Sequence, residues 1–180
     1  MGHASFRLLL GLALVSLLAA CATPATRQGM SLGAEDLFAE TVTPNPKLKS
    51  AVAVASVSGG KSTNPVWTSQ VDDKGFREAL EESLRLVGYL APDADGATHR
   101  VDVQLQELRQ PLFGMTFDVD SRVEYRVATP SGQMLFPVNA RGTAAVSDAF
   151  FGVERLRIAN ERSIKENIRA FIKQLSDESR

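Results

Sequence analysis

The sequence has few of the residues that metal centres and many catalytic sites require. Its 180 residues include one cysteine and two histidines, which excludes the usual zinc sites because these need several Cys or His ligands. The 20 Lys and Arg residues are balanced by 21 Asp and Glu residues, which argues against a nucleic-acid-binding protein. The apolar run from Leu8 to Leu18 has eleven residues and is too short to span a bilayer. With 44% hydrophobic and 23% charged residues, the composition is typical of one globular domain.

Residues 1–20 have the features of an export signal. A short polar start precedes the apolar run, and the run ends in small residues up to Ala20, as in signal peptides. The segment Leu18–Cys21 resembles the lipobox of bacterial lipoproteins, in which cleavage between Ala20 and Cys21 leaves an acylated cysteine at the new N-terminus. A soluble secreted protein is the alternative, but Cys21 has no partner for an internal disulfide. Because two acyl chains give stable anchoring, we expect the mature chain to be attached to a membrane through Cys21.

The residues after Cys21 indicate which membrane this is. In bacterial lipoproteins an Asp directly after the acylated cysteine is the usual sign of retention in the inner membrane. Ala22 and Thr23 stand there instead, so the resemblance implies the periplasmic face of the outer membrane. The rest of residues 21–49 contains Pro24, Pro44 and Pro46 and little apolar periodicity. This predicts a lipidated N-terminus followed by a flexible tether, with residues 34–38 as an optional helical turn that docks on the domain.

Residues 50–176 have the periodicity of one folded domain, followed by a tail at 177–180. The apolar run Ala51–Val57 predicts a strand buried on both faces, and an apolar stripe from Phe76 to Val87 predicts a helix that stops at Gly88. Alternating residues predict three further strands from 101 to 146, with a tight turn at 129–132. A closing amphipathic helix is expected at 153–175. The order strand, helix, three strands, helix predicts an α/β domain of the two-layer α+β type, with helices on one face of a mixed four-stranded sheet.

The predicted topology brings three loops to one end of the sheet. If a helical crossover joins the first two strands in parallel, the loops at 58–68, 110–114 and 147–152 share an end, and the tether enters at the opposite end. Exposed aromatic loops mark binding surfaces more often than catalytic centres, although these side chains could instead close the core. The loops contain the candidate partner-binding residues Trp67, Phe113, Asp148, Phe150 and Phe151.

Several patterns approach catalytic or nucleotide-binding motifs without matching them. The segment Ala55–Ser62 is similar to a phosphate-binding loop, but its first position is Ala and Asn64–Pro65 interrupts the helix that should follow. His99 could act as a general base, yet no nucleophile-elbow pattern accompanies it. Asp118 and Asp120 share one strand face and suit a solvated surface better than an acid–base pair. We therefore expect no cofactor and assign no catalytic residue.

Five basic residues of the closing helix fall within roughly a quarter of its circumference. Such a stripe is a candidate contact for anionic head groups or glycan phosphates. The alternative is an ordinary exposed face beside Glu161 and Glu166. The five residues are Arg155, Arg162, Lys165, Arg169 and Lys173.

Taken together, these elements resemble a family of small envelope proteins. The lipobox, the Pro-containing tether, the helix ending Leu84–Tyr89, the hairpin and the closing helix look like the YajG-type outer-membrane lipoproteins. Over residues 50–176 the element order is similar to the periplasmic domain of the penicillin-binding-protein activator lipoprotein and to the N-terminal domain of the Tol–Pal translocation protein TolB. The resemblance implies a location more than an activity, and Cys21 is its only functional residue that carries over.

Three functions remain open at this stage. We expect a non-catalytic outer-membrane lipoprotein, without nucleic-acid partners, whose loops bind another envelope component, a protein or a glycan. The second hypothesis is an enzyme acting on cell-wall or lipid substrates through Asp118, Asp120 or Asp148, which requires a deep pocket and a carboxyl group of raised pKa. The third is a lipid or glycolipid carrier, which requires an apolar cavity between the sheet and the helices.

Overall fold

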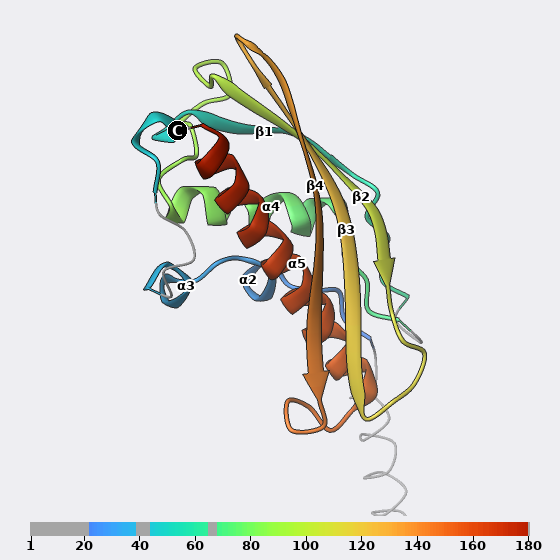
Figure 1. Ribbon diagram of the computed structural model, residues 1–180. Coiled ribbons are helices and arrows are strands. Elements are labelled where there is room, and N and C mark those ends of the chain that lie inside the picture. Colours follow the sequence, from blue (N-terminus) through green and yellow to red (C-terminus); the bar gives the residue numbers. More distant parts are fainter. Residues whose placement is uncertain (1–21, 39–43, 65–67, 180) are drawn as a thin grey trace, which may run out of the picture.

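The computed structural model describes residues 22–38, 44–64 and 68–179. Its centre is a four-stranded sheet in the order β1-β2-β3-β4, with the helices on one face (Figure 1). This confirms the predicted two-layer α+β fold and its order of elements. The strands are β1 (Val52–Ser58), β2 (His99–Arg109), β3 (Thr116–Thr129) and β4 (Gly132–Ala145), and the two long helices are α4 (Asp73–Leu86) and α5 (Gly152–Glu178).

The first strand and helix form where the sequence predicts them. β1 and β2 are parallel and α4 connects them, while the other two strand pairs are antiparallel. The Asp72 side chain caps α4 by accepting a hydrogen bond from Gly75 N at 2.8 Å, and Gly88 ends the helix with a φ of 78°, a conformation that favours glycine. The expectation that β1 is buried on both faces is wrong for its second half, because β1 is an edge strand and Ala55 and Ser56 are exposed.

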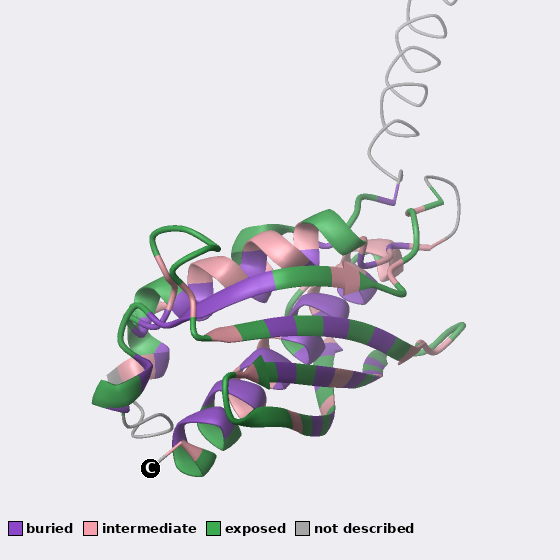
Figure 2. Cartoon of the chain, turned by 90° about the horizontal axis from the view of Figure 1, so that it is seen from above, coloured by how far each residue is buried: buried purple, intermediate pink, exposed green. Residues whose placement is uncertain are grey.

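The core lies between α5 and the inner face of the sheet. Buried and exposed residues alternate along β2, β3 and β4 (Figure 2), as expected for a sheet with one solvated face. Tyr125 of β3 stacks on Phe171 of α5 with ring centroids 4.0 Å apart, and Phe136 of β4 meets the same ring edge-on at 5.8 Å. These rings and the fully buried Ile168 fill the space between the two layers.

Two further contacts fix α5 against the sheet. A Cβ atom at Gly142 of β4 would lie 2.2 Å from Ser163 N, so only a glycine permits this close approach of strand and helix. Tyr125 Oη donates to Asn167 Oδ1 at 2.9 Å, and Asn167 Nδ2 donates to Ser121 Oγ at 3.1 Å. This buried network satisfies its polar groups internally and sets the position of α5 along β3.

The segment predicted to be a flexible tether is docked on the helices instead. It contains α2 (Arg27–Met30), α3 (Ala34–Phe38) and the short 3₁₀ helix η2 (Pro46–Leu48). Met30 and Leu48 are fully buried, and α2 packs against both α4 and α5. Thr26 donates from its backbone N and from its hydroxyl to Glu161 Oε1, both at 2.7 Å. The helical turn expected at residues 34–38 is confirmed as α3. The docking of the rest of the segment was not predicted, because its apolar residues are few and have no helical period.

The docked segment also places the first described residues at an end of the sheet where they were not expected. Ala25 N donates to Gln70 O at 3.0 Å, and Gln70 belongs to the connection that leaves β1 toward α4. The first described residues therefore lie at the end of the sheet where β1 ends, and η2 lies at the other end, where β1 begins. Figure 1 shows α2 and α3 on the side of the sheet that the long helices cover. The chain does enter β1 opposite the three loops, as expected, but Ala22 at the start of the described segment lies on the side of the loops.

Candidate functional site

Three connections meet at one end of the sheet, which we call the loop end. They are residues 59–72 between β1 and α4, described except for 65–67, residues 110–115 between β2 and β3, and residues 146–151 between β4 and α5. The convergence agrees with the topology expected from the sequence. It follows from the parallel pairing of β1 with β2 and the antiparallel pairing of the remaining strands.

Arg155 in the first turn of α5 links two of these loops. Its guanidinium donates to Phe150 O at 2.8 Å and to Ala149 O at 3.1 Å in one loop, and to Gly114 O at 3.0 Å in the other. The guanidinium carbon also lies 5.1 Å from the centre of the Phe117 ring, a cation–π distance. With 8% of its surface exposed, Arg155 is a buried link and not the anionic-surface contact that the sequence suggested.

Apolar side chains at the loop end are unusually exposed. Phe113 is 86% exposed and Phe150 is 80% exposed, and Phe150 meets Phe151 edge-to-face with centroids 5.5 Å apart. Of the eight large hydrophobic side chains that are exposed in the described ranges, six belong to the 110–115 and 146–151 loops. These six are Leu112, Phe113, Met115, Val146, Phe150 and Phe151.

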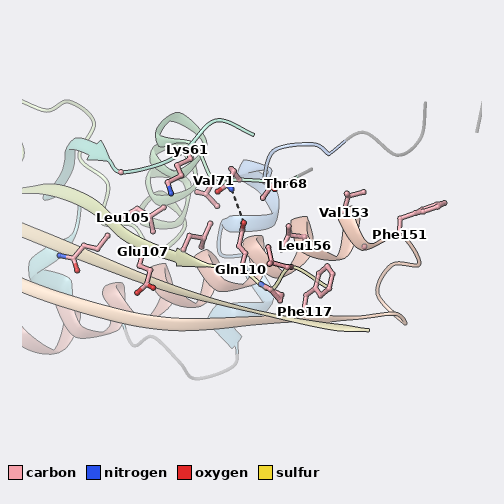
Figure 3. A pocket seen from close by; sticks show the side chains of 17 residues that line it. Lys61, Thr68, Val71, Leu105, Glu107, Gln110, Phe117, Phe151, Val153 and Leu156 are labelled. Atoms are coloured by element: carbon pink, nitrogen blue, oxygen red, sulfur yellow. Dashed lines mark hydrogen bonds between the residues drawn. The ribbon is translucent and has the colours of Figure 1, made fainter. Parts of the chain in front are cut away.

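A cavity of about 740 Å³ lies behind these loops and is lined by residues from all three (Figure 3). Its size falls within the range of small-molecule sites. Apolar side chains of β2, β3 and α5 line part of the wall, including Leu105, Phe117 and Leu156. Polar groups line the remainder, including Lys61 and Gln110 from the loops and Gln106 and Glu107 from β2. Such a mixed surface suits an amphipathic ligand.

Gln110 organises the polar wall of the cavity. Its Nε2 donates to Asn160 Oδ1 at 2.8 Å and to Ser69 O at 2.9 Å, and its Oε1 accepts from Gln70 Nε2 at 3.3 Å. Asn160 Nδ2 also donates to Ser69 O, at 3.0 Å. The network holds the β1–α4 connection against α5. Sequence reasoning missed these amides because they are far apart in the chain and match no motif.

The three candidate catalytic carboxylates lie outside the cavity lining. Asp148 accepts from Arg162 at 2.7 Å and from Ala145 N at 2.8 Å, and these bonds lower its pKa to about 2. Arg141 binds Asp120 at 2.7 Å and lowers the pKa of that carboxyl, while Asp118 accepts from Thr143 Oγ1 at 2.6 Å. The pKa values of Asp120 and Asp148 are therefore lowered, whereas a carboxyl group that acts as a general acid needs a raised pKa.

The rest of the predicted basic stripe binds groups of the chain itself. Arg162 pairs with Asp148, and Lys173 pairs with Asp177 at 3.1 Å. Lys165, at 2.9 Å, and Arg169 both pair with Asp36 of α3. Burial of Asp36 opposes its ionisation, but the hydrogen bond from Gly33 N and the two cations outweigh it and lower the pKa of Asp36. Arg162 therefore attaches the loop at 146–151 to α5, and Lys165 and Arg169 attach the N-terminal segment.

The motif-like patterns are explained by local structure. Gly60 N donates to Asp73 Oδ1 at 2.6 Å. The described residues 61–64 are not helical and α4 begins only at Asp73, whereas a phosphate-binding loop leads directly into a helix. His99 begins β2 at the end opposite the cavity, and burial lowers its pKa. No group of three or more His, Cys, Asp or Glu within the described residues is placed to hold a metal ion.

Part of the predicted site lies outside the described residues. This applies to the proposed cleavage and acylation position at Ala20 and Cys21 and to Trp67 of the β1–α4 connection. Across residues 22–38, 44–64 and 68–179, no helix combines the length and the apolar character needed to cross a membrane.

Comparison with known proteins gives a fold but no family. No protein-family model matches the chain, and no curated protein matches its sequence. A candidate lipoprotein from Caulobacter crescentus CB15 is similar in structure, with a TM-score of 0.51, 13% identity and coverage of 74% of this chain and 93% of that one. A protein from Xanthomonas campestris, described by the family model DUF330, has a TM-score of 0.50 and 10% identity, covering 77% and 93%.

These two neighbours support the fold and leave the finer resemblance open. At identities of 13% and 10%, the likeness shows the fold alone. One neighbour is described as a lipoprotein, the class that the lipobox-like segment Leu18–Cys21 indicates for this chain. Neither is described as YajG-type, so that assignment stays a prediction.

Proposed function

We propose that the protein is a non-catalytic lipoprotein of the cell envelope whose loop end binds another envelope component. Acyl chains on Cys21 attach it to the periplasmic face of the outer membrane. The observation that carries the proposal is the cavity of about 740 Å³, whose wall is built from all three loops. The exposed apolar side chains beside it add a binding surface of the kind that partners cover.

The chemistry of the cavity favours binding over catalysis. Its polar wall is built from the amides of Gln70, Gln106 and Gln110, together with Lys61 and Glu107, and Glu107 is paired with Arg109 at 3.2 Å. Amides donate and accept hydrogen bonds but do not ionise near neutral pH, so they do not serve as general acids or bases. A few polar groups among apolar ones orient a ligand.

The carrier hypothesis receives less support from the interior. The space between the sheet and α5 is filled by fully buried side chains, among them Tyr125, Ile168 and Phe171. A lipid held by this protein would therefore occupy the cavity at the loop end and not the space between the layers.

The anchor is tested by mass spectrometry of the N-terminal peptide and by membrane fractionation. We expect Cys21 to be the first residue of the mature chain and to carry acyl chains, and we expect the protein in the outer-membrane fraction. The Cys21→Ala variant should be absent from that fraction. A bare thiol on the mature chain would contradict the proposal.

The binding site is tested by a photoreactive amino acid placed at Val153, which lines the cavity. Irradiation of intact cells should give covalent adducts with one envelope component, identified by mass spectrometry. The matched control carries the same probe at Leu135, an exposed position on β4 outside the cavity. Equal adduct patterns at both positions would show that the cavity binds nothing specific.

A further inference from the structure

The proposed anchor and the exposed loops lie at the same end of the molecule. Ala22 and Ala25 are buried, Ala25 bonds to Gln70, and Thr26 bonds to Glu161. Cys21 is covalently the next residue before Ala22, and neighbouring Cα atoms are only about 3.8 Å apart. An acylated Cys21 therefore has no tether between its acyl chains and the docked segment, and it holds the loop end close to the bilayer.

The side chains at this end have the chemistry of a membrane-contacting surface. Leu112, Phe113, Phe150 and Phe151 stand in two loops that Arg155 joins. Aromatic and aliphatic groups on such loops gain free energy when they leave water for the region between head groups and acyl chains. The nearby carboxylate of Asp148 is paired with Arg162, so it does not present an unpaired charge to the lipid.

We propose that these two loops insert their apolar side chains into the same phospholipid bilayer that holds the acyl chains of Cys21. The inference rests on the acylation in the proposed function, and it names the bilayer as a partner of the loop end. The anchor would keep the loops at the bilayer surface and so raise their effective concentration there. Loop side chains that bind lipid only weakly in free solution would then insert. The cavity behind the loops then opens beside the membrane surface.

The contrast with the other end of the sheet supports lipid as the occupant. The turn between β3 and β4 presents Thr129 and Ser131, whose hydroxyls lie 3.0 Å apart. The exposed large apolar side chains are concentrated at the loop end, where Ala22 also lies. Leu135, on the other half of β4, is isolated from them. The exposed apolar surface therefore coincides with the end of the molecule that the proposed anchor would hold at the bilayer.

Photocrosslinking of the full-length acylated protein in vesicles of phosphatidylethanolamine and phosphatidylglycerol tests the inference. A benzophenone amino acid replaces Phe113, Phe150 or, as the control, Leu135. We expect phospholipid adducts at positions 113 and 150, with yields about tenfold or more above position 135, the ratio that burial of one large apolar side chain supports.

The outcomes separate the inference from the proposed function. If the same sample contains acylated Cys21 but the yields at 113 and 150 equal that at 135, the insertion is overturned and the anchor stands. Adducts only with a second copy of the chain, or with a protein partner when cells are irradiated, overturn it as well. A bare Cys21 overturns both the inference and the proposed function.

Discussion

The two ends of the sheet are built from the same strands but differ in what they leave exposed. At the loop end, apolar side chains such as Phe113 and Phe150 extend into solvent beside a cavity. At the other end, which we call the hairpin end, Asn45 Nδ2 donates to Ser176 O at 2.9 Å and Tyr89 Oη donates to Ser176 Oγ at 3.1 Å, and both bonds are buried. These buried polar groups of the hairpin end bond to one another, whereas the loop end exposes six large apolar side chains.

The comparison predicts that the hairpin half contributes most of the stability, and it agrees with the proposal that the loop end binds a partner. The stacked rings of Tyr125 and Phe171 and the buried amide of Asn167 all lie between α5 and β3. The loop tips contribute little buried surface by comparison. Substitutions at the two ends should therefore affect different measurements.

The largest effect is expected from Phe171→Ala in the hairpin half. The substitution removes a fully buried ring that contacts Tyr125 and Phe136, and it should lower the free energy of unfolding by about 3–5 kcal/mol. Chemical denaturation followed by circular dichroism measures this. If Phe171→Ala lowers the free energy of unfolding no more than a loop-tip variant does, the hairpin half is not the main source of stability.

Arg155→Met should have an intermediate effect, confined to the loop end. Met keeps much of the apolar stem but loses the bonds to Ala149, Phe150 and Gly114, so we expect a loss of about 2 kcal/mol. Amide hydrogen exchange should accelerate in both loops and stay unchanged in the β3–β4 turn. The matched control is Lys173→Met, which removes a cation from an exposed ion pair on the same helix and should change neither measurement.

A smaller effect is expected from pH through Asp36, which holds the N-terminal segment on α5. Its folded pKa is below the ordinary value of 3.8, so its ionised form stabilises the docked state fully above that value. The contribution declines as the pH falls below about 3.8 and disappears once the pH is below the folded pKa. The stability difference between the protein and Asp36→Asn should shrink over this range, and a constant difference would contradict the assignment.

The smallest effect on stability is expected from the double variant Phe113→Ser and Phe150→Ser. Because both rings are largely exposed, the free energy of unfolding should change by less than about 0.5 kcal/mol. In vesicles, a benzophenone probe at Leu112 should lose most of its lipid adducts. Leu135→Ser should leave both measurements unchanged. A large loss of stability from the double variant would show that these rings belong to the core.

The sequence predicted the fold because its periodicity is strong and local. Local patterns each predict one structure: the alternation in 116–129 a strand, the apolar stripe of α4 a helix, and Gly88 the end of that helix. The order of these elements then restricts the sheet topology. The convergence of the three loops followed from that topology alone. No side-chain contact was needed to predict it.

The candidate site could be predicted only in part, because it depends on contacts between distant residues. Arg155 was predicted to be a surface cation, because the adjacent residues in the sequence do not indicate that its guanidinium will bind Gly114 O and Phe150 O. The docking of residues 22–33 was missed because Thr26 meets Glu161 across 135 positions of sequence. Because of that omission, the position of Ala22 on the side of the loops was not expected.

The docked N-terminal segment determines how far the domain reaches. A flexible N-terminal segment would let the domain move away from the membrane into the periplasm. A segment packed along α4 and α5 would keep the domain of an acylated protein close to the lipid surface. Larger assemblies would then have to come to the membrane to meet it, and the spacing between the bilayer and any bound partner would be set by the rigid sheet.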